Sequence, residues 1–157
     1  MPPPRRRRPA CLHRPQSAHE PVRAGILLSP PWRGFPYSVA QESGNPRASP
    51  SGHLEHGESV CQAAVREAFE ETGITLGPAT LRHVLSIHQR NRGTSDTRVG
   101  FAFAPSAWTG EPVNAEPHKH SELIWAVPSA LPADTAEYTA AVITAAERGL
   151  AFTLNGW

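Results

Sequence analysis

The chain has 157 residues, which is enough for one domain, and 39% of them are hydrophobic. It has no apolar run long enough to cross a membrane and no secretory signal pattern, so we expect a cytoplasmic protein without a membrane partner. The net charge of +1 conceals a balance of +6 over residues 1–50 and of −5 over residues 51–157. We therefore expect a basic segment joined to an acidic domain.

The first fifty residues are rich in proline and arginine, beginning with "MPPPRRRRPA". Because this composition disfavours a packed core, we expect residues 1–49 to be disordered or aberrant and the folded domain to occupy residues 50–157. Within the first segment, residues 22–28 have the apolar content of a strand. The Arg5–Arg8 run lacks interleaved aromatic residues, so we favour a disordered arm over a nucleic-acid-binding one.

A helix is predicted between Ser59 and Gly73. Ser59 and Gln62 have the spacing of a capping box, which begins a helix, and Gly73 suits its end. At 100° per residue the helix separates an apolar side, expected to pack in the core, from an acidic side, expected to bind a ligand. The apolar side comprises Cys61, Val65, Ala68, Phe69 and Thr72, and the acidic side comprises Glu67, Glu70 and Glu71.

The acidic side of this helix favours a metal site. None of its three glutamates has Lys or Arg four residues later, and all lie near the C-terminal end, where the helix dipole disfavours negative charge. A solvated acidic surface is the alternative interpretation. We prefer a bound cation, because all-oxygen ligands suit Mg²⁺ or Mn²⁺.

The same stretch resembles the Nudix box. Gly52, Glu58 and residues 66–74, "REAFEETGI", match the specified positions of that motif. Ser51 stands where the family usually has a second glycine, and Ala68 is smaller than the usual large aliphatic residue. The resemblance covers roughly the last two-thirds of the chain. It implies an α/β fold, the Nudix-type α/β/α sandwich with a mixed sheet, which we expect to be incomplete at its N-terminal strands.

Resemblance to Nudix hydrolases implies a metal-dependent enzyme that cleaves a nucleoside diphosphate linked to another group. The substrate that we expect is a small-molecule nucleotide, a nucleoside triphosphate that gives a monophosphate and pyrophosphate. Mg²⁺ or Mn²⁺ would offset the repulsion between attacking water and the phosphate oxygens. The alternative is a non-catalytic or incompletely folded Nudix module that only binds.

The resemblance also implies roles for individual residues. Glu67 and Glu71 are the firmest metal ligands, Glu70 completes the cluster or orients water, and Ser51 offers its backbone carbonyl to the metal. One of these carboxylates is expected to take the proton from the attacking water, so Glu70, Glu67 and Arg66 are the candidate catalytic residues.

Three further positions of the motif are expected to be structural: Gly52, Glu58 and Gly73. Arg66 and Glu58 are expected to form an ion pair that ties the loop to the helix, the alternative being two independent surface charges. Gly52, together with Gly57, permits the tight loop before the helix.

Downstream of the motif, residues 81–90 and 98–105 partly alternate between apolar and polar and predict an antiparallel pair of strands, separated by the turn-rich residues 91–96. Residues 135–150 predict a second amphipathic helix. Its expected core side carries Tyr138, Ala141, Val142 and Ala145.

The segment 110–135 resembles the one that MutT-type nucleoside triphosphate diphosphatases carry after the box, where N-x-E-P-x-K precedes a strand. In several relatives an acidic residue of this region reaches the metals, so Glu116 is expected as a further ligand; an exposed loop glutamate is the alternative. His118 and His120 invite a zinc interpretation, which we reject because they have no Cys partner at ligand spacing.

Overall fold

The computed structural model describes residues 22–26, 37–42 and 45–157. The expected basic arm, including the Arg5–Arg8 run, lies outside these residues. Within the described part of the chain, no helix has the length and apolar character needed to cross a membrane.

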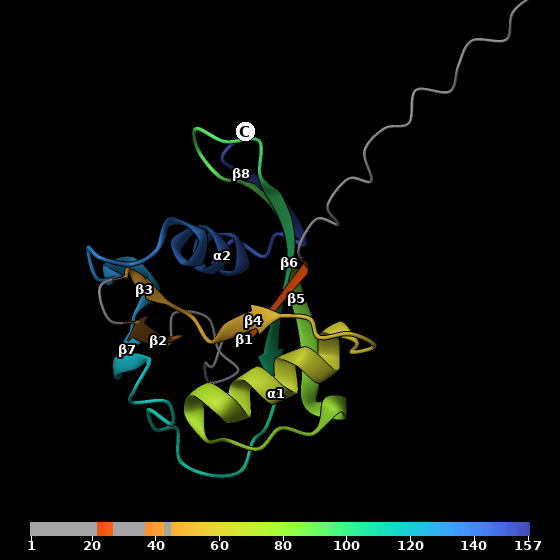
Figure 1. Ribbon diagram of the computed structural model, residues 1–157, viewed down its shortest axis with the longest axis vertical. Helices are drawn as coiled ribbons and strands as arrows, with labels where there is room; N and C mark the ends of the chain where they lie inside the picture. The colour runs from red at the N-terminus through yellow and green to blue at the C-terminus, as the bar shows by residue number, and fades with distance from the viewer. Residues whose placement is uncertain (1–21, 27–36, 43–44) are drawn as a thin grey trace, which may run out of the picture.

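A five-stranded mixed sheet forms the centre of the fold (Figure 1). Its order is β4 (Ser51–His53), β1 (Val22–Ile26), β6 (Thr97–Pro105), β5 (Leu81–Arg90) and β8 (Phe152–Asn155). β1 runs antiparallel to β4 and parallel to β6, whereas β8 runs parallel to β5. The predicted antiparallel pairing of β5 with β6 is confirmed.

A smaller antiparallel sheet lies beside the first. Its order is β3 (Arg47–Ala48), β2 (Tyr37–Glu42) and β7 (His120–Ala126). Arg47 forms ion pairs with Glu122 of β7 and with Asp134, which fixes the short strand β3 to its surroundings. Single 3₁₀ turns occur at η1 (Pro78–Thr80) and η2 (Pro128–Ala130).

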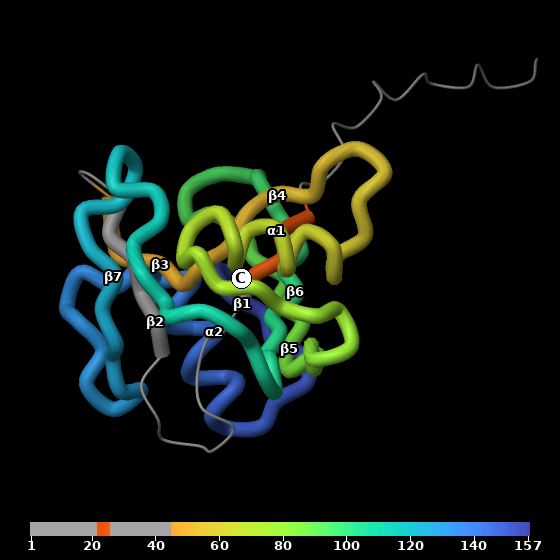
Figure 2. Tube along the Cα trace, turned by 90° about the horizontal axis from the view of Figure 1, so that it is seen from below, coloured from red at the N-terminus to blue at the C-terminus, as the bar shows by residue number. Residues whose placement is uncertain are grey.

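The helices α1 (Val60–Thr72) and α2 (Glu137–Glu147) cover opposite faces of the five-stranded sheet, as Figures 1 and 2 show from two directions. Strand alternation divides the core accordingly. Ala24 and Phe103 pack with the alanines of α1, whereas Leu85 and Ile87 pack with residues of α2. The expected α/β/α sandwich is confirmed.

The predicted boundaries of α1 are confirmed. The Gln62 backbone N–H donates to Ser59 Oγ at 3.2 Å, and the Ser59 N–H donates to Gln62 Oε1 at 2.9 Å, so the capping box is complete. Gly73 follows the helix with φ of 71°, a left-handed conformation that favours glycine.

The predicted core side of α1 is wrong for Phe69, whose side chain is 58% exposed. The helix turns its alanines toward the sheet instead, because small side chains let the helix approach the strands closely. Its buried residues are Ala63, Ala64, Ala68 and Thr72. In α2, Val142 and Ala145 are buried as predicted, together with Thr139 and Ile143, while Tyr138 and Ala141 pack partly buried against this core.

Two described strands come from the region in which missing strands were expected. β1 lies within the sheet, between β4 and β6, and agrees with the strand predicted inside residues 22–28. β2 pairs with β7 and was not predicted. The described strands therefore reach back to Val22, ahead of the expected domain start at residue 50.

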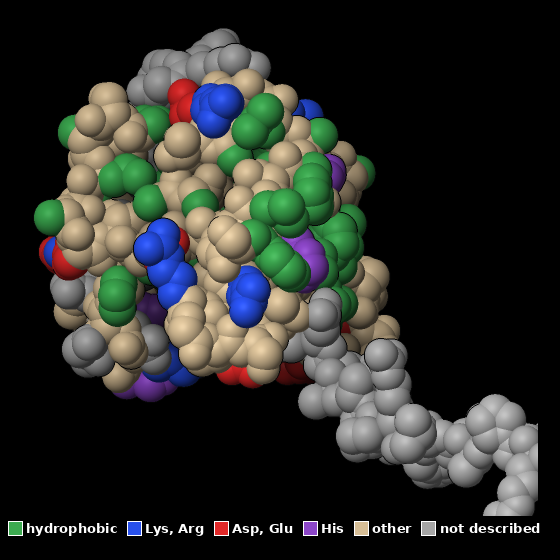
Figure 3. Space-filling view, turned by 90° about the horizontal axis from the view of Figure 1, so that it is seen from above, with side chains coloured by type: hydrophobic (Ala, Val, Ile, Leu, Met, Phe, Trp, Pro, Cys, Tyr) green, Lys and Arg blue, Asp and Glu red, His purple; other side chains and the backbone are tan. Residues whose placement is uncertain are grey.

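The molecular surface seen from above has a mixed character (Figure 3). Hydrophobic side chains gather around a histidine on one side of this view, with a Lys or Arg side chain beside them and others elsewhere on the same face. The exposed large hydrophobic residues include Phe152 and Leu154 of β8 and the C-terminal Trp157. The Trp157 ring packs on His88, with ring centroids 4.8 Å apart, which fixes the C-terminus to β5.

Candidate active site

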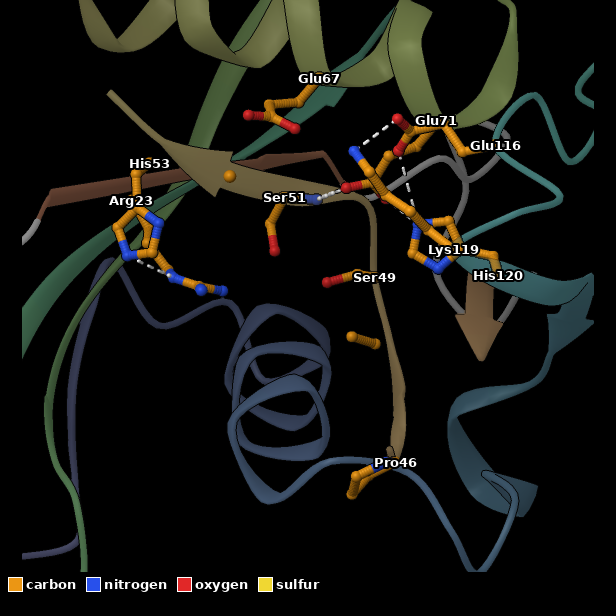
Figure 4. A pocket seen from close by; sticks show the side chains of 12 residues that line it. Arg23, Pro46, Ser49, Ser51, His53, Glu67, Glu71, Glu116, Lys119 and His120 are labelled. Carbon is orange, nitrogen blue, oxygen red and sulfur yellow. Dashed lines mark hydrogen bonds and ion pairs between the residues drawn. The ribbon is translucent and has the colours of Figure 1, made fainter. Parts of the chain in front are cut away.

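A cavity of about 320 Å³ lies along the edge strand β4, between α1 and α2 (Figure 4). Its acidic part is formed by Glu67 and Glu71 of α1 and by Glu116 of the loop between β6 and β7. Lys119 of the same loop and His120, the first residue of β7, complete this part of the lining. The side chains of the three glutamates are only 11–17% exposed.

The loop that carries Glu116 is fixed to the C-terminal end of α1. The Val113 N–H donates to the Thr72 carbonyl at 3.0 Å, and the Ala115 N–H donates to the Glu71 carbonyl at 3.1 Å. These bonds satisfy carbonyl groups that the helix end leaves unpaired. They also place Glu116 against Glu71, although 45 residues separate the two in the sequence.

Glycine is required at position 52 because β4 passes directly under the Glu67 carboxylate. A Cβ atom on Gly52 would lie 1.7 Å from Glu67 Oε1 and 2.1 Å from its Cδ. Any side chain here would therefore displace this carboxylate. The glycine of the motif thus serves the position of Glu67 as well as the turn of the loop.

Arg66 joins the loop before α1 to two of the glutamates. Its guanidinium donates to both carboxylate oxygens of Glu58 at 2.9 Å, to Glu67 at 2.6 Å and to Glu70 at 3.0 Å. The expected ion pair between Arg66 and Glu58 is present, with both side chains largely shielded from water. Hydrogen bonding to Glu58 is the main cause that raises the pKa of Arg66, so the guanidinium stays charged.

Glu70 differs from the other glutamates of the predicted cluster. Its side chain is 46% exposed and does not line the cavity. It forms an ion pair with Arg66, which lies four residues earlier in the helix. Sequence reasoning did not predict this pair, because it considered only cations that follow the glutamates. The metal site expected on one helix surface is thus divided, with Glu67 and Glu71 toward the cavity and Glu70 outside it.

Glu71 is the most perturbed carboxylate in the cavity. Burial is the main cause that raises its pKa to about 8, and the negative charge of Glu67 adds to it, followed by that of Glu116. The Ser51 N–H, which donates to Glu71 Oε1 at 3.3 Å, acts in the opposite direction. A nearby cation would relieve this accumulation of negative charge.

The Glu116 side chain lines the cavity, although most of its neighbours in the loop are exposed. Lys119 Nζ donates to Glu116 Oε1 at 2.6 Å. His120 Nε2 lies 3.8 Å from Glu116 Oε2 and 3.9 Å from Glu71 Oε2, so the histidine borders both carboxylates.

The side-chain positions of the described residues do not bring three His, Cys, Asp or Glu groups together as a ready-made metal cage. Glu67 and Glu116 face protein cations, and Glu71 faces a backbone N–H. The donor chemistry nevertheless fits a hard divalent ion, because three shielded carboxylates line one part of the cavity. Burial, and then the charges of Glu67 and Glu116, raise the pKa of Glu71, and such an ion would lower it.

Sequence reasoning missed the opposite side of the cavity. Arg23 of β1 and His53 of β4 are directly opposed across the two strands, and Arg23 Nε donates to His53 Nε2 at 3.3 Å. Partial shielding from water lowers the pKa of His53, and the nearby charges of Arg23 and Arg98 lower it further. His53 adjoins the motif glycine, but no sequence signal connects Arg23, thirty residues away, to it.

A family model described as the NUDIX domain matches residues 21–146. This match begins ahead of the domain boundary expected at residues 49 and 50. Among curated proteins, Phosphatase NudJ of Escherichia coli (strain K12) and of Shigella flexneri is 41% identical over 71 residues. The alignment covers 43% of this chain and 44% of the relative, so the chain matches less than half the length of these relatives.

Solved structures share the fold. The MutT NUDIX hydrolase from Burkholderia pseudomallei has a TM-score of 0.65 at 23% sequence identity, covering 78% of this chain and 96% of that one. The mMutator MutT protein from Bacillus halodurans has a TM-score of 0.68 at 17% identity, covering 85% of this chain and 88% of that one. At these identities the likeness concerns the arrangement of the strands and helices alone.

Proposed function

Because the chain belongs to the Nudix family, we propose that it hydrolyses a nucleoside diphosphate linked to another group. The expected substrate is a nucleoside triphosphate, cleaved to a monophosphate and pyrophosphate. The observation that carries this proposal is the cavity in which the largely shielded carboxylates of Glu67, Glu71 and Glu116 and the basic side chain of Arg23 form one lining. Such a cavity suits a polyanion whose charge is shared between a bound cation and protein donors.

Nudix hydrolases generally use divalent metal ions. In this chain we assign the ligands to Glu67, Glu71 and Glu116, with the Ser51 carbonyl beside them and with Mg²⁺ or Mn²⁺ as the ion. When bound, the ion neutralises phosphate oxygens and so reduces their repulsion of attacking water.

The chain's own residues then hold the reacting groups. Arg66 does not line the cavity, so we treat it as a positioning residue that holds Glu67 through the 2.6 Å hydrogen bond and fixes the loop through Glu58. Of the two candidates for accepting the proton of water, Glu67 and Glu70, the first is favoured by its place in the cavity wall. Lys119 is placed to approach phosphate oxygens beside Glu116.

Release of phosphate and pyrophosphate from nucleoside triphosphates, nucleoside diphosphate sugars and dinucleoside polyphosphates tests this function. We expect turnover with Mg²⁺ or Mn²⁺, loss of turnover with EDTA, and recovery when the metal is restored. Full turnover in EDTA would contradict the metal mechanism. If near-UV circular dichroism of the four Trp shows a folded protein that cleaves none of these compounds, the hydrolase proposal is wrong and a binding module is favoured.

A further inference from the structure

The cavity has a basic part that the proposed metal ligands do not use. Figure 4 shows Arg23 and His53 on the other side of β4 from Glu67. Because successive residues of a strand point to opposite sheet faces, Gly52 lies under Glu67 while its neighbour His53 faces the side of Arg23. The cavity therefore extends around the edge of β4, from an acidic part to a basic one.

Arg23 is held in place without being neutralised. Within the described residues its guanidinium donates to His53 Nε2 and forms no ion pair with a carboxylate. A ring nitrogen that accepts from arginine belongs to a neutral imidazole. The hydrogen bond thus orients Arg23 and leaves its positive charge available.

A second arginine adds to this charge from the neighbouring strand. In the pairing of β1 with β6, Arg23 lies beside Gly100. Arg98 is two residues before Gly100 on β6, so its side chain faces the same side of the sheet as that of Arg23. The Arg98 guanidinium lies 5.1 Å from the ring centroid of Tyr138, and its Nε is buried without a hydrogen-bond partner among the described residues. Burial and then the charge of Arg23 lower the pKa of Arg98, as expected when two cations lie close together, and neither has an ion pair with a carboxylate among the described residues.

We propose that Arg23, supported by Arg98, forms a phosphate-binding subsite for a part of the substrate that the metal-binding glutamates do not hold. Two partly shielded arginines that have no carboxylate partner in the described part of the chain are stabilised by an anion, and phosphate offers oxygens to guanidinium donors. The inference rests on the proposed function and narrows its substrate class. Because Arg23 and the glutamates line one cavity, the proposal is that a chain of three phosphates contacts both parts, whereas a diphosphate joined to a neutral sugar offers no third phosphate to Arg23.

The first test compares inorganic tripolyphosphate with inorganic pyrophosphate, measured by calorimetry on the full chain with Mg²⁺ present. The wild-type protein should bind tripolyphosphate at least about tenfold more tightly, because the third phosphate adds charge-assisted hydrogen bonds. Equal affinity for the two compounds would overturn the subsite. This comparison needs no variant and no turnover.

The second test repeats the comparison with variants. Arg23→Gln should abolish the preference for tripolyphosphate, and Arg23→Lys should retain part of it because the charge remains. The exposed Arg82 of β5 provides the control, and Arg82→Gln should keep the full preference. A folded Arg23→Gln protein that prefers tripolyphosphate as strongly as the wild type would refute the role of Arg23.

The two proposals fail in different ways. If nucleotides are not cleaved but the Arg23-dependent preference persists, the hydrolase function is wrong and the phosphate subsite stands. If nucleoside triphosphates are cleaved while Arg23→Gln leaves both the preference and kcat/KM unchanged, the subsite is wrong and the hydrolase stands.

Discussion

Replacing Gly52 with alanine should lower the reaction rate strongly while changing the stability of the fold only slightly. The new Cβ would lie 1.7 Å from Oε1, 2.1 Å from Cδ and 2.6 Å from Oε2 of Glu67. Van der Waals contact needs about 3.5 Å, so the carboxylate has to move by roughly 1.5 Å or more. Because a carboxylate is the end of a flexible side chain, it can move away without unfolding the protein.

We expect Gly52→Ala to lower kcat at least about 10²-fold, since a displacement of about 1 Å at a catalytic group costs that much. The free energy of unfolding should fall by only about 1 kcal/mol, the scale of one hydrogen bond between Glu67 and Arg66. Kinetics at saturating substrate and urea unfolding measure the two quantities separately.

Gly57→Ala is the matched control, because its added Cβ would meet nothing within 4 Å while its φ of 80° is strained for alanine. It should cost about 1 kcal/mol of stability and leave the rate within a few-fold. A Gly52→Ala enzyme with nearly wild-type kcat, or one that loses rate only in proportion to unfolding, would refute a catalytic position of Glu67 over Gly52.

Further predictions concern the charges of the site. Glu71→Gln should lower the rate at least about 10²-fold. Glu55→Gln, at an exposed position of the loop between β4 and α1, should leave it within a few-fold, and comparable losses in both would contradict a ligand role for Glu71. Because the folded-state pKa of Glu71 is raised from 4.5 to about 8, metal-free stability should fall as pH rises through that window, by on the order of a few kcal/mol. Thermal unfolding at pH 6 and pH 8 checks this, with Mg²⁺ expected to restore stability at pH 8 and Glu71→Gln expected to flatten the dependence. The single ammonium group of Arg66→Lys cannot hydrogen-bond to Glu58 and Glu67 at once as the guanidinium does. The rate should therefore fall by about tenfold or more, and the melting temperature should fall as well. An unchanged rate would leave Arg66 with a purely structural role.

Local signals predicted the bounds of α1 but not the outward position of Phe69. The capping box and Gly73 act through bonds within a few residues, which the sequence displays directly. Which side packs depends on the partner surface. The sheet accepts the alanines, so Phe69 lies outward and the flank with Glu67 and Glu71 is shielded. The predicted core side is therefore wrong at Phe69 alone, since Ala68 and Thr72 are buried and Cys61 and Val65 pack partly buried against the core.

The acidic part of the site could be predicted because motif spacing places Glu67, Glu71 and Gly52 close together in sequence. Its basic part could not, because Arg23 reaches the cavity only through pairing of β1 with β4. The composition of the proline-rich segment around β1 also hid this strand's place in the sheet interior. Pairings between distant strands are set by the whole fold rather than by local pattern.

The most direct test of the proposed site is an anomalous-difference map from crystals of the full chain grown with Mn²⁺. We predict a peak in the cavity within ligand distance of at least two of Glu67, Glu71 and Glu116, about 2.0–2.3 Å from their oxygens. The carboxylates should then have turned away from Arg66 and Lys119. A saturating Mn²⁺ soak that leaves this cavity without a peak, with Glu67 still bonded to Arg66, would contradict a metal-dependent hydrolase site at these residues.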